Sequence, residues 1–151
     1  SPAQWDIAKL NWVNAHYLKT SADAALVPLV RRQLATRGFA IDDDARLAAL
    51  IGLFKDRCAT TVDLADWLMM LVETIHPRAE DLAQYVTAPV KPAIAALAEA
   101  LKTVEWTKEA IAAAFKQALA THGLKMPQLA PAVRVLVCGR AQTPSIDAVL
   151  A

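Results

Sequence analysis

The residues best suited to specific chemistry in this chain are arginines and hydroxyls that lie where a helical pattern stops. The first is Arg57, in the stretch LFKDRC at residues 53–58, at the predicted end of a helix. A guanidinium carries a planar fork of donors that fits acceptors on a base edge, such as O2 and N3 of cytosine or O6 and N7 of guanine. Alternatively, Arg57 is a structural residue that interacts with the helix dipole and pairs with Asp56 or Asp63.

A second candidate group lies in the C-terminal tail, residues 124–151, where residues 139–144 interrupt the apolar pattern. Arg134, Thr143 and Ile146 offer a charged fork, a hydroxyl and an apolar platform around this turn. Single-stranded RNA loops are recognised by side chains that pack on splayed bases and hydrogen-bond to their edges. In the alternative interpretation, Arg134 extends from a packed helix, Thr143 caps the last helix, and Ile146 belongs to the core.

The sequence contains no recognisable constellation of catalytic or metal-binding residues. It has neither a GxxxxGK[ST] loop nor a GxGxxG motif after a strand, and its three histidines are scattered. The run Asp42–Asp44 is better explained as the acidic start of a helix than as a metal site. Cys58 and Cys138 form no Cys-x-x-Cys pair, so we expect reduced thiols and neither zinc nor a disulfide. These observations favour a binding module over a stand-alone enzyme.

Composition predicts a soluble helical protein. The chain is 56% hydrophobic and 21% charged with 4 glycines, which is too apolar for disorder and too poor in turn residues for an all-β fold. No apolar run reaches the about 20 residues that cross a bilayer, and the N-terminus does not resemble a signal peptide. Residues 91–140 hold 7 basic and 3 acidic side chains, whereas residues 1–90 hold 9 and 11. This bias fits either a polyanionic partner or a solvated helix face.

Apolar residues recur at helical spacing along almost the whole chain, which predicts an all-α fold. The predicted helices cover residues 5–18, 21–37, 42–57, 62–75, 78–86, 90–104 and 108–122, with a short helix at the C-terminus. The expected apolar stripe of the first helix consists of Ile7, Leu10, Val13 or Asn14, and Tyr17 or Leu18. The run RVLVC at 134–138 alternates as a strand would, but we favour a helix because no second strand candidate exists.

Helix boundaries are predicted from residues that cap or break helices. Side-chain caps are expected at Asp6, at Thr20 or Ser21, at Thr60 or Thr61, and at Thr107. Gly38 and Gly123 are suited to end helices in the left-handed conformation. Pro28 is expected to kink or split the second helix.

A chain of 151 residues can bury one sizeable core or two small helical ones. Pro77 ends one predicted helix, and together with Pro89 and Pro92 it brackets the weak helix at 78–86. We therefore expect a seam between two lobes in this region.

Four stretches of the chain resemble the C-terminal anticodon-binding region of bacterial glutamyl-tRNA synthetases. They are KLNWVNAHYLK at 9–19, LFKDRC followed by LADW, VEWTKEAI at 104–111, and GLKMPQLAPAVRVLVCGRAQTPSIDAVLA at 123–151. They occur in the family's order and cover nearly the whole chain. The resemblance implies an all-α fold of two small packed helical subdomains, as in class I synthetases. Residues 1–76 would form a stem-contact and anticodon-binding subdomain, and residues 77–151 the C-terminal anticodon-binding subdomain.

The resemblance also implies roles for particular residues. Arg57 matches the arginine that reads the third anticodon base, a cytosine, and so separates glutamate tRNA from glutamine tRNA. Arg134, Thr143 and Ile146 match positions that contact the other anticodon bases through side chain or nearby backbone. The family more usually has Gln-Pro-Leu-Arg or Met-Pro-Leu-Arg where this chain has Pro-Ala-Val-Arg at 131–134. The arginine is kept and the proline is displaced.

The synthetase signatures of the HIGH and KMSK kind, which bind ATP, are absent from these 151 residues. By its resemblance the chain is therefore expected to be a fragment of a cytoplasmic, monomeric glutamate–tRNA ligase. It would bind tRNA(Glu) but would be inactive alone, because glutamate, ATP and magnesium are handled by the catalytic domain. The alternative is a helical protein-protein interaction module that binds no nucleic acid.

Overall fold

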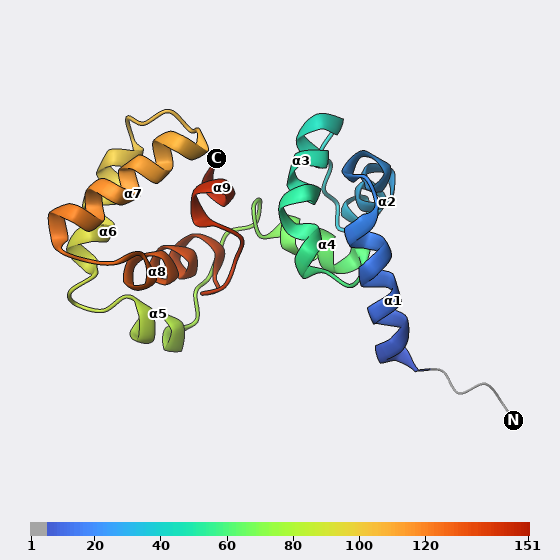
Figure 1. The fold of residues 1–151 in the computed structure, drawn as a ribbon, viewed down its shortest axis with the longest axis horizontal. Helices are drawn as coiled ribbons and strands as arrows, with labels where there is room; N and C mark the ends of the chain where they lie inside the picture. Colours follow the sequence, from blue (N-terminus) through green and yellow to red (C-terminus); the bar gives the residue numbers. More distant parts are fainter. Residues whose placement is uncertain (1–5) are drawn as a thin grey trace, which may run out of the picture. The chain divides into compact units, whose positions relative to one another are not determined.

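The computed structural model describes residues 6–151, whose regular structure is helical throughout (Figure 1). The elements are α1 (Ile7–Thr20), α2 (Asp23–Ala35), α3 (Asp44–Phe54), the 3-10 helix η1 (Lys55–Arg57), α4 (Thr61–Met69), α5 (Ala79–Tyr85), α6 (Lys91–Leu101), α7 (Lys108–His122), α8 (Met126–Cys138) and α9 (Ile146–Leu150). The all-α prediction is confirmed, and the ambiguous run RVLVC is the end of α8. The predicted helix start at Trp5 lies outside the described residues.

The helices form two compact units. The N-terminal unit ends at Glu73 and the C-terminal unit begins at Thr74, just before the boundary expected after His76. In the N-terminal unit, α2 packs against α3 and α4, and the stacked rings of Phe54 and Trp67 have centroids 5.3 Å apart. Its core comprises fully buried side chains of these three helices: Val30, Leu34, Leu47, Ile51, Phe54, Leu64 and Leu68.

The C-terminal unit is built around α6, α7 and α8. Helix α6 packs along α7, α5 packs against α8, and the short α9 contacts both α7 and α8. The core of this unit consists of Ala93, Leu97, Ile111, Phe115, Leu129 and Val135. Helices α7 and α8 both end at glycines in the left-handed conformation, Gly123 at φ 62° and Gly139 at φ 69°. The predicted stop at Gly123 is thus confirmed.

The apolar stripe expected on the first helix is largely exposed. Ile7, Leu10 and Tyr17 are 62%, 48% and 65% exposed, and Leu18 is the residue of α1 that is buried. The reason is that α1 contacts its unit mainly at η1, while its first turns extend beyond the other helices of that unit (Figure 1). The apolar periodicity correctly predicted the helix, but it did not predict that most of these side chains would be exposed.

Three of the expected caps are confirmed. The Asp6 side chain accepts from the backbone of α1, Thr60 caps α4, and Thr107 accepts from Ala110 N at 3.3 Å. At α4 the cap is reciprocal, since Asp63 accepts from Thr60 N at 2.8 Å. The start of the helix after η1 is therefore rigidly defined.

Two other boundary predictions are wrong, and the split that was one alternative at Pro28 does not occur. Thr20 and Ser21 do not cap α2; their hydroxyls donate back to the carbonyls of His16 and Tyr17 in the last turns of α1. Helix α2 runs through Pro28 without splitting, and the alternative, a kink at Pro28, stays a prediction. Helix α4 ends at Met69 instead of continuing to residue 75. The side chains of Leu71 and Val72 are exposed, so extending the helix over them would bury little apolar surface.

Candidate nucleic-acid interface

Arg57 is the exposed last residue of η1. Both carboxylates that could have neutralised it are engaged elsewhere. Asp56 lies 3.9 Å from Lys19 Nζ, and Asp63 accepts from the backbone N–H groups of Ala59 and Thr60. Within residues 6–151, Arg57 makes no hydrogen bond or ion pair. Its donor fork is therefore available to a ligand.

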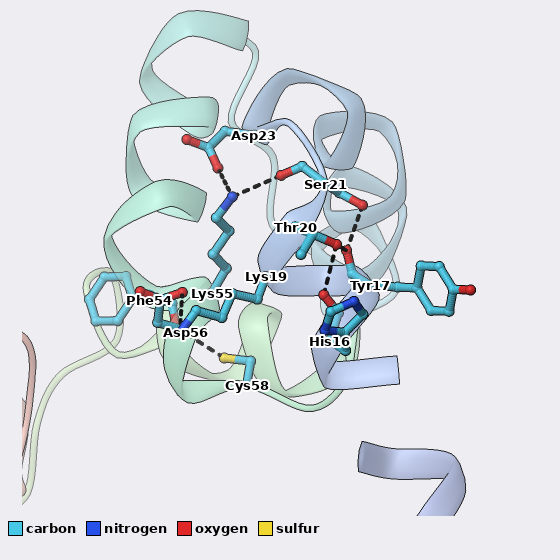
Figure 2. A network of polar contacts seen from close by, with 10 residues as sticks. All are labelled: His16, Tyr17, Lys19, Thr20, Ser21, Asp23, Phe54, Lys55, Asp56 and Cys58. Carbon is cyan, nitrogen blue, oxygen red and sulfur yellow. Dashed lines mark hydrogen bonds and ion pairs between the residues drawn. The ribbon is translucent and has the colours of Figure 1, made fainter. Parts of the chain in front are cut away.

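The backbone on either side of Arg57 is anchored by buried side chains. Phe54, just before η1, is fully buried, and Cys58, just after it, is 5% exposed. The Cys58 thiol donates to the Phe54 carbonyl, with the sulfur 3.4 Å from the oxygen (Figure 2). Burial, reinforced by the negative charges of Asp63 and Asp66, raises the pKa of the Cys58 thiol to about 12. Cys58 is thus a neutral packing residue that holds the turn.

Arg134 lies on α8 and is partly buried. Its Nε is buried and has no hydrogen-bond partner within the described part of the chain. A buried N–H without an acceptor is costly, which makes Arg134 an unsatisfied polar position in α8. Arg134 and Arg140 lower the pKa of Cys138, but its burial outweighs both and raises that pKa. Both guanidinium groups therefore lie close enough to Cys138 to act on its charge.

Thr143 and Ile146 lie inside the fold. They are 5% and 3% exposed, and the Thr143 hydroxyl donates to the carbonyl of Pro144 at 2.8 Å. Thr143 is not the cap of α9, whose N-cap is Ser145 without a side-chain bond. The two buried side chains support the turn between α8 and α9 from within. Arg140, on the same turn, is exposed.

The predicted site residues fall into two groups. Arg134, Thr143 and Ile146 belong to the C-terminal unit, where α8 and α9 are in contact. Arg57 belongs to the N-terminal unit. The structure thus places three of the predicted residues in the C-terminal unit and the fourth in the N-terminal unit.

The sequence did not reveal the ion pair that holds η1. Lys55 contacts Asp23 and the backbone of Ser21, residues far away in sequence (Figure 2). The one feature of the sequence that could have indicated this contact is Gly52, because a glycine within a helical pattern often marks a close approach of another group.

Neither a metal site nor a membrane span is found in residues 6–151. No group of three or more His, Cys, Asp or Glu side chains in this range is placed to hold a metal ion. No helix in the same range is both long and apolar enough to cross a bilayer.

Comparison with known proteins shows what this arrangement resembles. A family described as "Anticodon binding domain" matches residues 24–151. The glutamate–tRNA ligase of a Polaromonas species is 58% identical over 150 residues, and that of Paracidovorax citrulli is 55% identical over 152 residues. Each match covers 99% of this chain and 32% of the relative, so the chain spans about a third of their length.

A solved structure shares the fold. The crystal structure of a glutamate tRNA ligase from Elizabethkingia meningosepticum superposes with a TM-score of 0.85 at 19% sequence identity. The superposition covers 99% of this chain and 30% of that structure.

Proposed function

The chain belongs to the anticodon-binding domain family that its residues 24–151 match, and from this premise we propose that it is the tRNA-reading part of a glutamate–tRNA ligase. Its relatives at 55–58% identity carry that name. In such a ligase, glutamate is joined to tRNA(Glu) at the expense of ATP, with magnesium. These steps would take place in a catalytic domain outside the 151 residues, so the chain alone binds tRNA and performs no chemistry.

The observation that carries the proposal is that the Arg57 side chain is exposed and unpaired within residues 6–151. An exposed guanidinium without a protein partner, on a turn fixed at both ends, is suited to a bidentate contact with a base. We assign to Arg57 the reading of cytosine at the third anticodon position. In the C-terminal unit, Arg134 supplies a second contact to the loop, while Thr143 and Ile146 shape the turn whose backbone faces the RNA.

The test compares two anticodon stem-loop hairpins that differ only in the third anticodon base, cytosine or guanine. We expect the wild-type chain to prefer the cytosine hairpin and Arg57→Gln to lose about 1–3 kcal/mol of that preference, because the guanidinium contacts the base edge. Equilibrium binding gives a dissociation constant for each hairpin, and the ratio of the two constants measures the preference.

Arg46→Gln is the matched control. Arg46 is an exposed arginine of the same unit, so this variant loses the same charge without altering η1. It should keep the wild-type ratio. An equal ratio in Arg57→Gln and wild type would refute the role assigned to Arg57.

A second candidate function is a helical protein-interaction module. The exposed apolar side chains of α1, among them Trp12 at 72%, favour it. Such a module would bind a protein with little dependence on salt and would not bind the hairpins at low ionic strength.

A further inference from the structure

We propose that Lys55 is a positioning residue for anticodon reading: held by Asp23 and by the backbone of Ser21, it sets the direction in which Arg57 presents its guanidinium. The inference rests on the proposed function, since it assumes that Arg57 reads the third anticodon base. It adds a specificity determinant that does not itself touch the RNA.

The Lys55 ammonium joins three elements. Its Nζ donates to the carbonyl of Ser21 at 2.8 Å and lies 2.7 Å from Asp23 Oδ1 (Figure 2). The contact with Asp23 is ionic, because Oδ1 receives no aligned hydrogen bond. Ser21 is the C-cap of α1 and Asp23 is the first residue of α2. One side chain therefore ties η1 to the junction between α1 and α2.

This link is the less exposed of the two ion pairs that attach η1. The Lys55 side chain is 16% exposed and that of Asp23 39%. The other pair, Lys19 with Asp56, is 65% and 62% exposed and 3.9 Å long. Exposed pairs contribute little because water and salt screen them, whereas a shielded pair that also makes a hydrogen bond is stronger.

Gly52 makes room for this link. A Cβ built on Gly52 would lie 2.6 Å from Asp23 Oδ2, closer than van der Waals contact allows. Glycine is unfavourable inside a helix, and at this position of α3 it leaves space for the carboxylate of Asp23. With a larger residue at position 52, the Asp23 side chain would have to shift.

The geometry of η1 transmits the constraint from Lys55 to Arg57. A 3-10 helix has three residues per turn, so the directions of its side chains are related by fixed rotations. When Lys55 points inward to Asp23, Arg57 of the same single turn is exposed. Phe54 and Cys58 hold the two ends of the turn, and Lys55 is the restraint within it. Releasing Lys55 lets the residues between those ends reorient Arg57, and a bidentate contact with a base tolerates little reorientation. Contacts with phosphates are less directional and should survive.

The first test is Lys55→Met, which keeps the length of the side chain and removes its ammonium. In the complete 151-residue chain, we expect the preference for the cytosine over the guanine hairpin to fall about three- to tenfold. Affinity for the guanine hairpin should change by less than about twofold, because phosphate contacts remain. Lys102→Met is the matched control: it removes an exposed lysine paired with Glu99 in the other unit and should leave the preference unchanged.

Two further variants separate positioning from a general loss of structure. Asp23→Asn removes the charge of the partner, and the double variant Asp23→Asn/Lys55→Met should lose no more preference than Lys55→Met alone, because both changes break one link. Gly52→Ala leaves both charged residues in place but pushes Asp23 away, and it should lower the preference even if Lys55→Met does not fold. Circular dichroism and a cooperative urea transition establish that each variant is folded.

The outcomes distinguish this inference from the function on which it rests. If Arg57→Gln abolishes the preference while folded Lys55→Met and Gly52→Ala keep the wild-type ratio, Lys55 is not a positioning residue and the proposed function stands. A uniform loss of affinity for both hairpins, with the ratio unchanged, also refutes positioning. If Arg57→Gln itself keeps the ratio, the assumption about Arg57 fails and the inference fails with it.

Discussion

At the scale of single residues, the candidate site depends on which polar groups near η1 already have partners. Asp56 and Asp63 are held by Lys19 and by backbone N–H groups, which leaves Arg57 exposed and unpaired within residues 6–151. Cys58 beside it is buried and neutral. At this turn the Arg57 guanidinium is therefore exposed, while the neighbouring carboxylates of Asp56 and Asp63 interact with other groups of the protein.

The buried thiol of Cys58 gives a prediction about pH. In the unfolded chain an ordinary cysteine becomes a thiolate near pH 9, whereas the folded Cys58 thiol has a pKa of about 12. The folded state therefore retains a proton that the unfolded state releases, and the free energy of unfolding should fall as pH rises from about 9 to about 12. Urea denaturation at pH 8 and pH 10 measures this, with Cys58→Ala as the control that should show a smaller fall. An equal fall in both proteins would contradict the role of Cys58.

Arg57 could be selected from the sequence as a candidate because its stretch resembles a known family. That its guanidinium has no partner within the protein could not be predicted from the sequence. That property depends on Asp56 pairing with a lysine of α1, which no local pattern reports. The burial of Thr143 and Ile146 could not be predicted either, since an apolar or hydroxyl side chain at a turn can face in either direction.

At the scale of elements, glycines at the ends of α7 and α8 allow a controlled comparison. Both have positive φ, but a Cβ on Gly123 would meet nothing within 4 Å, whereas a Cβ on Gly139 would lie 3.0 Å from Ile75 Cγ2. The end of α8 is therefore packed more tightly than the end of α7.

We predict that Gly139→Ala destabilises the chain more than Gly123→Ala. Gly123→Ala should cost about 1–2 kcal/mol, the cost of a left-handed conformation for a residue with a Cβ. Gly139→Ala should cost roughly 1 kcal/mol more, because its methyl group also crowds Ile75. The free energies of unfolding from urea titrations test this. Equal losses would mean that Ile75 moves aside without cost.

Element type could be predicted from the sequence more reliably than element contacts. The apolar period predicted helices α1 to α7 but not the separate 3-10 helix η1. Helix α8 was favoured despite its β-branched residues because no second strand was available to pair with it. The misassigned caps at Thr20 and Ser21 arose because a hydroxyl between two helices can serve the end of one or the start of the next. The length of α4 was overestimated because Leu71 and Val72 continue the apolar period although their side chains are exposed.

At the scale of the whole molecule, charge distinguishes the two units. The basic excess of residues 91–140 is displayed on the surface, since the lysines of this range are all exposed: Lys91, Lys102, Lys108, Lys116 and Lys125. We propose that phosphate contacts from such lysines supply affinity without regard to sequence, while Arg57 in the other unit supplies selectivity. We propose that residues up to about 76 read the third anticodon base and that the remainder binds the rest of the loop.

The most direct test of this account is the salt dependence of hairpin binding by the wild-type chain. If the chain neutralises about three phosphates, its affinity for the cytosine hairpin should fall roughly 20-fold between about 50 and about 200 mM salt, because bound counterions are released. A protein of the same size but without a basic surface serves as the control for non-specific retention. The absence of binding at the lowest salt, or an affinity that does not change over this range, would contradict the central claim that the chain binds an anticodon loop.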